Sequence, residues 1–432
     1  MLEPVVLPAR RRRTRATKAS RPKAAEVGGA SPAALWAALA ASVFLFAFGV
    51  LHYGFYVRDS LADTPIYAKY GHAVLGGHVP YRDFGVEYPP GALPVFVLPA
   101  AMTPGGGYSS YVIAFQWVMA LCGAALAAAV AVVLVRQGRS RRAVAAAVAL
   151  VGLAPLALGP VVVSRFDLWP AALTGAALAA LVGGRGRLAF GVLAVAVAAK
   201  LYPAVLVGPA LVYVWRRAGR REAVVAGSIF AAVLTVLFLP FLVLAPHGVM
   251  TTIIGQASRP LQIESLGSAT LIALHHIGGF IVSVQSSHGS QNLGGSAAAT
   301  AAVVQGIVQP AAILLAWLWF VRGPSTDTRF LRACAAAVAA FVALGKVLSP
   351  QFLLWLLPVV PLVRGRRGVA AGLLLGCALA LTQLWFPYRY MAFAYSFDPV
   401  SSWLVLARDL VLVGLLAVLV WPAKQPMVTG RR

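Results

Sequence analysis

The sequence has 432 residues, of which 60% are hydrophobic and 11% are charged, and its mean hydropathy is +0.83. Soluble domains contain about a quarter charged residues, so this composition excludes a soluble globular protein and indicates one embedded in a lipid bilayer. The 36 Lys and Arg residues outnumber the 12 Asp and Glu residues and give a net charge of +24. Such an excess is typical either of a nucleic-acid partner or of a membrane topology signal, and the positions of the charges decide which.

The predicted elements begin with residues 1–30, whose Arg, Lys, Pro, Ala and Ser predict a disordered basic cytoplasmic tail. Residues 31–432 are expected to form the transmembrane domain, starting with a retained signal anchor at 34–57. Further apolar segments lie at 109–135, 143–163, 168–182, 188–199, 203–215, 223–245, 297–321, 330–347, 352–363, 369–386 and 400–421. The sequence therefore predicts an all-α, polytopic membrane protein with about 12 transmembrane helices, some of them short or broken.

Basic residues cluster in alternate connections between these segments. With the N-terminus in the cytoplasm, most of the Lys and Arg residues fall on the cytoplasmic side, as the positive-inside rule requires. The charge excess is then an orientation signal, and no nucleic-acid partner is expected. Both termini are predicted to be cytoplasmic in a multi-pass protein of the plasma membrane. Most acids fall on the opposite side, so we expect the active site to face outward.

Three apolar segments, 188–199, 203–215 and 352–363, are too short to cross the membrane. As helices they reach about 18–20 Å, whereas the hydrocarbon core is about 30 Å thick. Short helices persist only where protein or a water-filled cavity satisfies their ends, so they predict an outward-facing cavity. Lys200 and Lys346 lie at the expected rim of this cavity. The longest outer segment is 246–296, in which the moderately apolar piece 268–283 is interpreted as an interfacial or re-entrant helix.

The first outer loop, 58–91, carries four acids: Asp59, Asp63, Asp83 and Glu87. Acids directly beyond a transmembrane helix are costly unless they are solvated or used. For Asp59, Asp83 and Glu87 taken singly, a hydrated loop explains the charge. Asp63 is the stronger candidate for function, because Thr64-Pro65 can begin a helix and Tyr67 falls one turn later.

Several short motifs occur together along the chain. They are Asp63 with Tyr67, Gly77 with Tyr81, Tyr88-Pro89-Pro90, Arg165-Phe166-Asp167, Lys200-Leu201-Tyr202-Pro203 and the stretch from Lys346 to Gln351. In this combination the sequence resembles the GT-C membrane glycosyltransferases, and most closely the polyprenol-phosphate-mannose-dependent mannosyltransferases of glycosyltransferase family 87. The resemblance covers residues from about 34 to 420. It implies an inverting transfer of a sugar, mannose in that family, from a polyprenyl-phosphate donor to a glycolipid or glycan acceptor of the cell envelope.

The resemblance also implies roles for individual residues. Asp63 would be the general base that takes the proton of the acceptor hydroxyl. The anionic phosphate of the donor needs cations, and the candidates are Lys200, Lys346, Arg165 and Arg408. Candidate substrate-binding residues are Tyr67, Tyr81, Glu87, Tyr88, Asp167, Tyr202 and Gln351. Two of these assignments have structural alternatives: Asp167 could pair with Arg165, and an internal ion pair between Arg408 and Asp409 explains Arg408 equally well.

No metal or other cofactor is expected. The sequence lacks a His-Glu-x-x-His motif and a Cys-His cluster, and a monophosphate leaving group matched by lysines needs no metal. It also lacks a Gly-x-x-x-x-Gly-Lys-Ser/Thr loop, which favours a lipid-linked donor over a nucleotide-sugar. The main alternative is a transporter or lipid flippase, because broken helices with lysines also suit an alternating-access site. An outward-facing acyltransferase is a third possibility, although no His is placed convincingly beside an acid.

Overall fold

The computed structural model describes residues 31–57 and 61–421. The described residues from Pro32 onward form one compact unit. The basic tail predicted for residues 1–30, the acid Asp59 and the last eleven residues lie outside the described residues. What is described is mostly helical, with a single two-stranded hairpin, so the all-α class predicted from the sequence is confirmed.

The α-helices are α1 (Pro32–Val50), α2 (Thr64–Leu75), α3 (Pro94–Met102), α4 (Tyr108–Arg136), α5 (Arg141–Gly152), α6 (Ala154–Leu158), α7 (Val161–Ser164), α8 (Leu168–Val182), α9 (Gly186–Ala199), α10 (Val207–Ala218), α11 (Arg220–Leu244), α12 (Pro246–Ala257), α13 (Leu266–Gly278), α14 (Ser296–Val321), α15 (Asp327–Ala343), α16 (Gly365–Trp385), α17 (Tyr390–Ser396) and α18 (Pro399–Val420). Short 3₁₀ helices are η1 (Gly54–Val57), η2 (Pro90–Ala92), η3 (Tyr202–Leu206), η4 (Pro350–Leu356) and η5 (Val360–Leu362). Strands β1 (Ser283–Ser287) and β2 (Ser290–Gly294) form one antiparallel hairpin.

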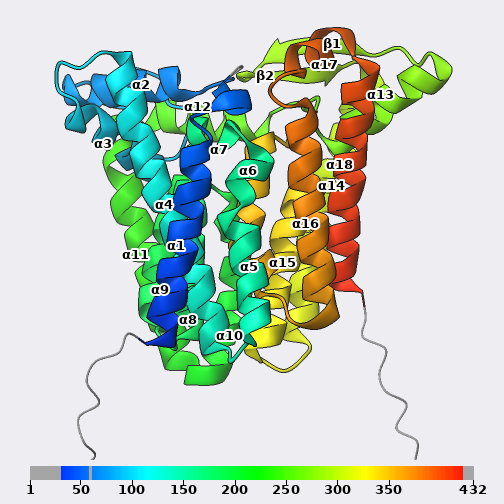
Figure 1. Cartoon of the computed structure of the whole chain (residues 1–432). Helices are drawn as coiled ribbons and strands as arrows, with labels where there is room; N and C mark the ends of the chain where they lie inside the picture. The colour runs from blue at the N-terminus through cyan, green and yellow to red at the C-terminus, as the bar shows by residue number, and fades with distance from the viewer. Residues whose placement is uncertain (1–30, 58–60, 422–432) are drawn as a thin grey trace, which may run out of the picture. The chain divides into compact units, whose positions relative to one another are not determined.

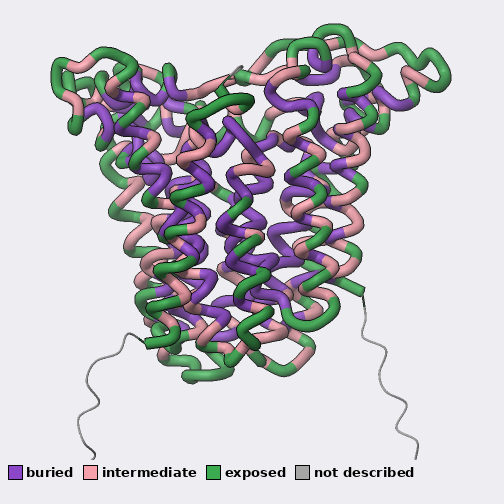
Figure 2. The backbone as a smooth tube through the Cα atoms, in the orientation of Figure 1, coloured by how far each residue is buried: buried purple, intermediate pink, exposed green. Residues whose placement is uncertain are grey.

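Within the described residues, six helices are long and apolar enough to cross a membrane: α1, α4, α11, α14, α16 and α18. They run roughly parallel to one another, with shorter helices between them (Figure 1). Buried residues run through the centre of the bundle (Figure 2). The Ala-rich helix α15 lies in this core, with twelve of its seventeen residues buried. The described fold is therefore that of a multi-pass membrane protein.

The segments predicted to be short are short in the structure. Segment 188–199 is α9, 203–215 is divided between η3 and α10, and 352–363 consists of η4, η5 and the turn between them. One prediction is wrong, because 143–163 is not a single helix but the three helices α5, α6 and α7. Pro155 removes a backbone donor and Gly159 adopts a positive φ of 64°, so the helix cannot continue through this stretch. The predicted anchor 34–57 likewise stops being α-helical at Val50.

The connections at one end of the bundle are structured. Helices α2, α3, α12, α13 and α17 and the hairpin gather at this end, whereas α1 begins and α18 ends at the opposite one (Figure 1). The piece interpreted as an interfacial or re-entrant helix is α13, which has 13 residues and is followed by β1. His288 and Gly289 form the two-residue hairpin turn, both with positive φ, which is the conformation such tight turns require.

Candidate functional site

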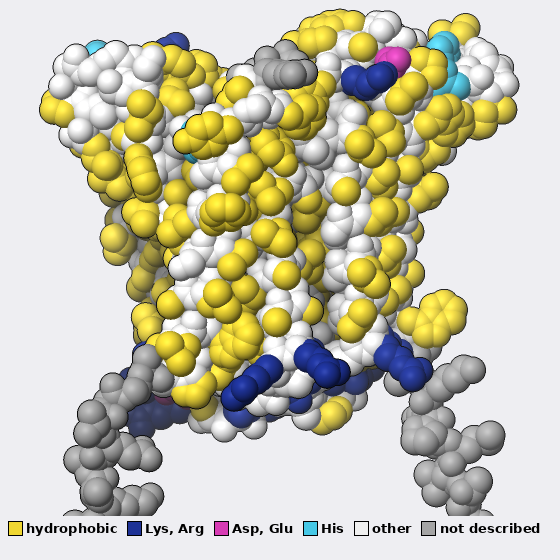
Figure 3. All heavy atoms as spheres, viewed as in Figure 1, with side chains coloured by type: hydrophobic (Ala, Val, Ile, Leu, Met, Phe, Trp, Pro, Cys, Tyr) yellow, Lys and Arg dark blue, Asp and Glu magenta, His cyan; other side chains and the backbone are white. Residues whose placement is uncertain are grey.

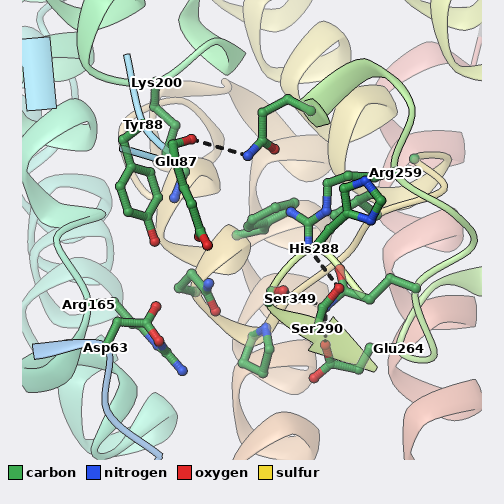
Figure 4. Close-up of a pocket in the computed structure, with 18 of the residues that line it drawn as sticks. Asp63, Glu87, Tyr88, Arg165, Lys200, Arg259, Glu264, His288, Ser290 and Ser349 are labelled. Carbon is green, nitrogen blue, oxygen red and sulfur yellow. Dashed lines mark hydrogen bonds and ion pairs between the residues drawn. The ribbon is translucent and has the colours of Figure 1, made fainter. Parts of the chain in front are cut away.

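A cavity of about 820 Å³ opens at the end where the short helices and the hairpin gather. Its lining comes from the first outer loop, from Arg165 before α8, from the end of α9, from residues 256–264, from the hairpin and from the stretch after α15. In Figure 4, Asp63 and Arg165 lie on one side of the cavity, and Arg259, His288 and Ser290 lie on the other. Of the three short segments predicted to surround a cavity, 352–363 contributes the lining residues Phe352 and Trp355, whereas 188–199 and 203–215 contribute none and only residues 200–202 between them line it.

Asp63 lies in the cavity wall directly before α2. Its backbone carbonyl accepts hydrogen bonds from Ile66 (2.9 Å) and Tyr67 (3.1 Å), which start the helix. Its side chain does not cap the helix. Instead Oδ1 forms an ion pair with Nη1 of Arg165, and Oδ2 accepts a hydrogen bond of 3.3 Å from the hydroxyl of Tyr67. The ion pair stabilises the ionised carboxylate, which is the form that accepts a proton.

Arg165 is held in place by two contacts. Its second terminal nitrogen, Nη2, donates to the carbonyl of Leu61 (3.1 Å), while Nη1 meets Asp63. The alternative in which Asp167 pairs with Arg165 is wrong, because Asp167 pairs with Lys200. Arg165 therefore orients the carboxylate of Asp63 and lines the cavity beside it.

Lys200 ends α9 and lies in an aromatic pocket. Its Nζ donates to Oδ1 of Asp167 over 2.6 Å and lies 4.6 Å from the ring centre of Phe166 and 5.1 Å from that of Trp355. The indole nitrogen of Trp355 donates to the same oxygen of Asp167 over 2.7 Å. The charge of Lys200 is thus balanced by an acid that is fully buried and lies behind the cavity lining. Tyr202 stacks on Trp355 with ring centres 4.5 Å apart.

The other residues predicted from the first outer loop divide into two groups. Tyr67 and Tyr81 are buried and do not line the cavity. The hydroxyl of Tyr81 donates to the carbonyl of Tyr88 over 2.7 Å and so fixes the Tyr88-Pro89-Pro90 turn. Glu87 and Tyr88 do line the cavity. Tyr67 and Tyr81 are therefore supports of the wall, whereas Glu87 and Tyr88 can contact a ligand.

Of the three site residues predicted from the second half of the chain, two line the cavity and one does not. Lys346 and Gln351 line the cavity, and Nζ of Lys346 donates to the carbonyl of Ala257 over 3.0 Å. Arg408 is completely buried and does not line the cavity. Its Nε lies 2.7 Å from Oδ1 of Asp409, and its Nη2 donates to the carbonyl of Glu264. The ion-pair alternative for Arg408 thus matches the structure. Its hydrogen bond to the carbonyl of Glu264 holds the backbone of the outer segment in place.

The sequence reasoning missed the wall formed by residues 256–264 and the hairpin. Arg259, Glu264, His288 and Ser290 all line the cavity. Glu264 is 2% exposed, and its burial raises the pKa of this carboxyl to about 8. The sequence offered one signal for this wall: Glu264 is an acid in an outer segment that is otherwise poor in charge. That signal does not indicate which residues surround Glu264.

Among residues 31–57 and 61–421, no group of three or more His, Cys, Asp or Glu side chains is close enough to hold a metal ion. The predicted site instead has carboxylates, guanidinium and ammonium groups, amides and aromatic rings around one cavity. Such a set can bind a polyhydroxylated ligand with an anionic group and can accept a proton from it.

Comparison with known proteins gives one family match. The model of glycosyltransferase family 87 matches residues 87–350. Among solved structures, the crystal structure of ArnT from Cupriavidus metallidurans bound to undecaprenyl phosphate is similar, with 15% sequence identity over 89% of this chain and 76% of that chain and a TM-score of 0.47. No curated protein matches the sequence significantly.

Proposed function

Because the chain belongs to glycosyltransferase family 87, we propose that it is an inverting enzyme that transfers a sugar, mannose, from a polyprenyl-phosphate donor. The acceptor in this proposal is a glycolipid or glycan of the cell envelope. The observation that carries the proposal is the position of Asp63, a carboxylate in the wall of a cavity of about 820 Å³ at the end opposite the start of α1.

The proposed chemistry uses Asp63 as the general base. The acceptor hydroxyl loses its proton to the carboxylate as its oxygen forms a bond to the anomeric carbon of the sugar. The bond between that carbon and the phosphate oxygen breaks, and its electron pair leaves with the polyprenyl phosphate. Attack opposite to the leaving group inverts the anomeric carbon. Arg165 and Tyr67 support this role because they bind the two oxygens of Asp63 and so fix its direction.

The distribution of charge supports an outward-facing cavity. Lys and Arg side chains gather at the end of the bundle where α1 begins and α18 ends, on the face shown in Figure 3. By the positive-inside rule that end faces the cytoplasm, and the cavity then opens on the outer side of the plasma membrane. A donor carried on a lipid reaches such a cavity from the bilayer. A nucleotide-sugar made in the cytoplasm does not.

The proposal is tested with membranes containing the wild-type protein, Asp63→Asn or Asp83→Asn. Asp83 is the matched control, because it is an acid of the same loop, pairs with Arg82 and lies outside the cavity lining. We expect Asp63→Asn to lower sugar transfer from polyprenyl-phosphate-mannose about 100-fold or more, the typical contribution of a general base, and Asp83→Asn to retain it. Inversion is checked by NMR of the product linkage.

Two outcomes would contradict the proposal. Full transfer by Asp63→Asn would remove this residue as the base. Absence of transfer by the wild-type protein from any polyprenyl-phosphate sugar, together with lipid or solute movement across proteoliposomes, would instead support the transporter or flippase.

A further inference from the structure

The cations around the cavity differ in whether an acid already neutralises them. Arg165 is paired with Asp63, and Lys200 is paired with Asp167. Across residues 31–57 and 61–421, neither Arg259 nor Lys346 has an Asp or Glu oxygen within ion-pair distance. A cation that faces a cavity without an acid partner is the one free to bind an incoming anion.

The two acids that act electrostatically on Arg259 are Glu87 and Glu264, and neither forms an ion pair with it. Glu264 contributes little negative charge at neutral pH, because burial raises its pKa to about 8. Glu87 acts on Arg259 from beyond ion-pair distance. Among the described residues, Arg259 and Lys346 therefore line the cavity without an ion-paired acid.

The loop that carries Arg259 is attached to Lys346 by hydrogen bonds. Nζ of Lys346 donates to the carbonyl of Ala257 (3.0 Å), and the carbonyl of Lys346 accepts from the backbone nitrogen of Gln262 (2.9 Å). The loop 257–262 is thus attached at both ends to Lys346, and Arg259 lies between the two attachment points. Gln262 also donates from its side chain to Ser349 (2.8 Å).

The hairpin fixes the same loop from the other side. The carbonyl of Leu261 accepts from Leu293 (2.8 Å), and Ile263 donates to the carbonyl of Gln291 (3.1 Å). Nη2 of Arg259 donates to the hydroxyl of Ser290 over 3.0 Å. The guanidinium is therefore oriented by β2, while its Nε has no hydrogen-bond partner within the described residues. Guanidinium and ammonium groups each keep donors available after these contacts.

We infer that Arg259 and Lys346, with Ser290 orienting the guanidinium, bind the phosphate of the lipid-linked sugar donor, in place of Lys200, Arg165 and Arg408. This inference rests on the proposed function. Arg259 and Asp63 lie on opposite sides of the cavity (Figure 4). In an inverting transfer the base-bound acceptor oxygen and the leaving phosphate are on opposite faces of the sugar, so a sugar ring between these two walls has both groups where the reaction needs them.

The experiment compares the wild-type protein with Arg259→Gln, Arg259→Lys and Arg82→Gln. Arg82 is an exposed arginine outside the cavity lining and serves as the control. Loss of charged hydrogen bonds to a phosphate is expected to raise the KM for the polyprenyl-phosphate sugar about tenfold to a hundredfold in Arg259→Gln. Arg259→Lys keeps the charge and should recover part of this loss. The KM for the acceptor should not change.

A second measurement does not depend on turnover. Undecaprenyl phosphate, which has the headgroup of the proposed leaving group, is titrated into the purified protein in detergent, and binding is followed by thermal stabilisation. Arg259→Gln should lose about tenfold or more in affinity, and Arg82→Gln should bind as the wild type does. If Arg259→Gln does not fold, Lys346→Gln is used in both measurements with the same expected direction.

The possible results separate this inference from the proposed function. An unchanged donor KM and unchanged binding of undecaprenyl phosphate in the folded variant would overturn the inference while the enzyme remained a glycosyltransferase. A higher KM for the acceptor with no change for the donor would also overturn it, because the phosphate bound there would belong to the acceptor. A wild-type protein that transfers no sugar would overturn the proposed function itself.

Discussion

Lys200 and Lys346 occupy similar places in the sequence, yet their ammonium groups have different partners. Each follows a helix and precedes a Pro-containing 3₁₀ helix. Lys200 donates to the buried Asp167 and is surrounded by aromatic rings, whereas Lys346 donates to a backbone carbonyl. A lysine that follows a helix at the cavity is therefore a candidate ligand only when no acid within the fold already neutralises it.

The largest expected effect is on the Lys200 side of this comparison. Lys200→Gln leaves Asp167 as a buried carboxylate without a cation, and removal of one partner of a buried ion pair costs about 3–5 kcal/mol. We expect a correspondingly lower midpoint of thermal unfolding in detergent. The double variant Lys200→Gln with Asp167→Asn should recover much of the loss. A Lys200→Gln protein as stable as the wild type would show that the pair is not structural.

Trp355→Phe examines the same cluster with a smaller change. It removes the indole donor to Asp167 (2.7 Å) and keeps an aromatic ring for Tyr202 to stack on. A hydrogen bond to a charged group contributes about 1.5–3 kcal/mol, so the unfolding free energy should fall by about that amount. Phe352→Leu, which removes a neighbouring ring but no hydrogen bond to Asp167, is the control for altered packing.

On the Lys346 side, the effect should be on substrate binding. Lys346→Gln removes no partner from a buried acid, so its unfolding midpoint should stay close to that of the wild type. Its KM for the donor should rise about tenfold, which corresponds to about 1.4 kcal/mol. The donor KM and the unfolding midpoint, measured for both Lys200→Gln and Lys346→Gln, compare a structural lysine with a substrate-binding one directly. Equal losses of stability in both variants would contradict the distinction between them.

The last expected effect is a change in the pH dependence of stability. Burial raises the pKa of Glu264 from its ordinary 4.5 to about 8. Between these values the folded protein binds a proton that the unfolded chain has lost, so stability falls as pH rises towards about 8. Glu264→Gln cannot ionise and should show a flatter curve when unfolding midpoints are measured from about pH 5 to pH 8. Identical slopes would show that Glu264 is ionised throughout.

Hydropathy and charge placement were enough to predict a helical membrane protein, three short segments and the presence of a cavity. These features follow from local properties: the length of an apolar run, and basic residues between runs. Asp63 and Lys346 were identified because they lie beside such features. The break in 143–163 could not be read from hydropathy, because a Pro and a Gly can stay within a continuous apolar run and still end a helix.

The identity of ion-pair partners could not be predicted, because it depends on contacts between distant parts of the chain. Asp167 is two residues from Arg165 but pairs with Lys200, which the packing of α8 against α9 brings to it. Arg259 meets Ser290 only because loop 257–262 runs beside β2. The outer segment was read as a connection with one short helix, and its role in the cavity wall requires the folded hairpin.

Helix α14 has one exposed apolar face and one face that contacts the stretch leading to the cavity. Much of its surface is exposed and apolar, including Val303, Ile307 and Leu315. On its inner face, Gln305 donates to the carbonyl of Gly345 (3.0 Å), the residue directly before Lys346. Gln309 donates to the carbonyl of Phe341 in α15. A helix of 26 residues is about 39 Å long and tilts to match bilayer thickness. One face of α14 is therefore exposed and apolar, as contact with lipid requires, while Gln305 and Gln309 on the other face hold the backbone that leads to Lys346 at the cavity.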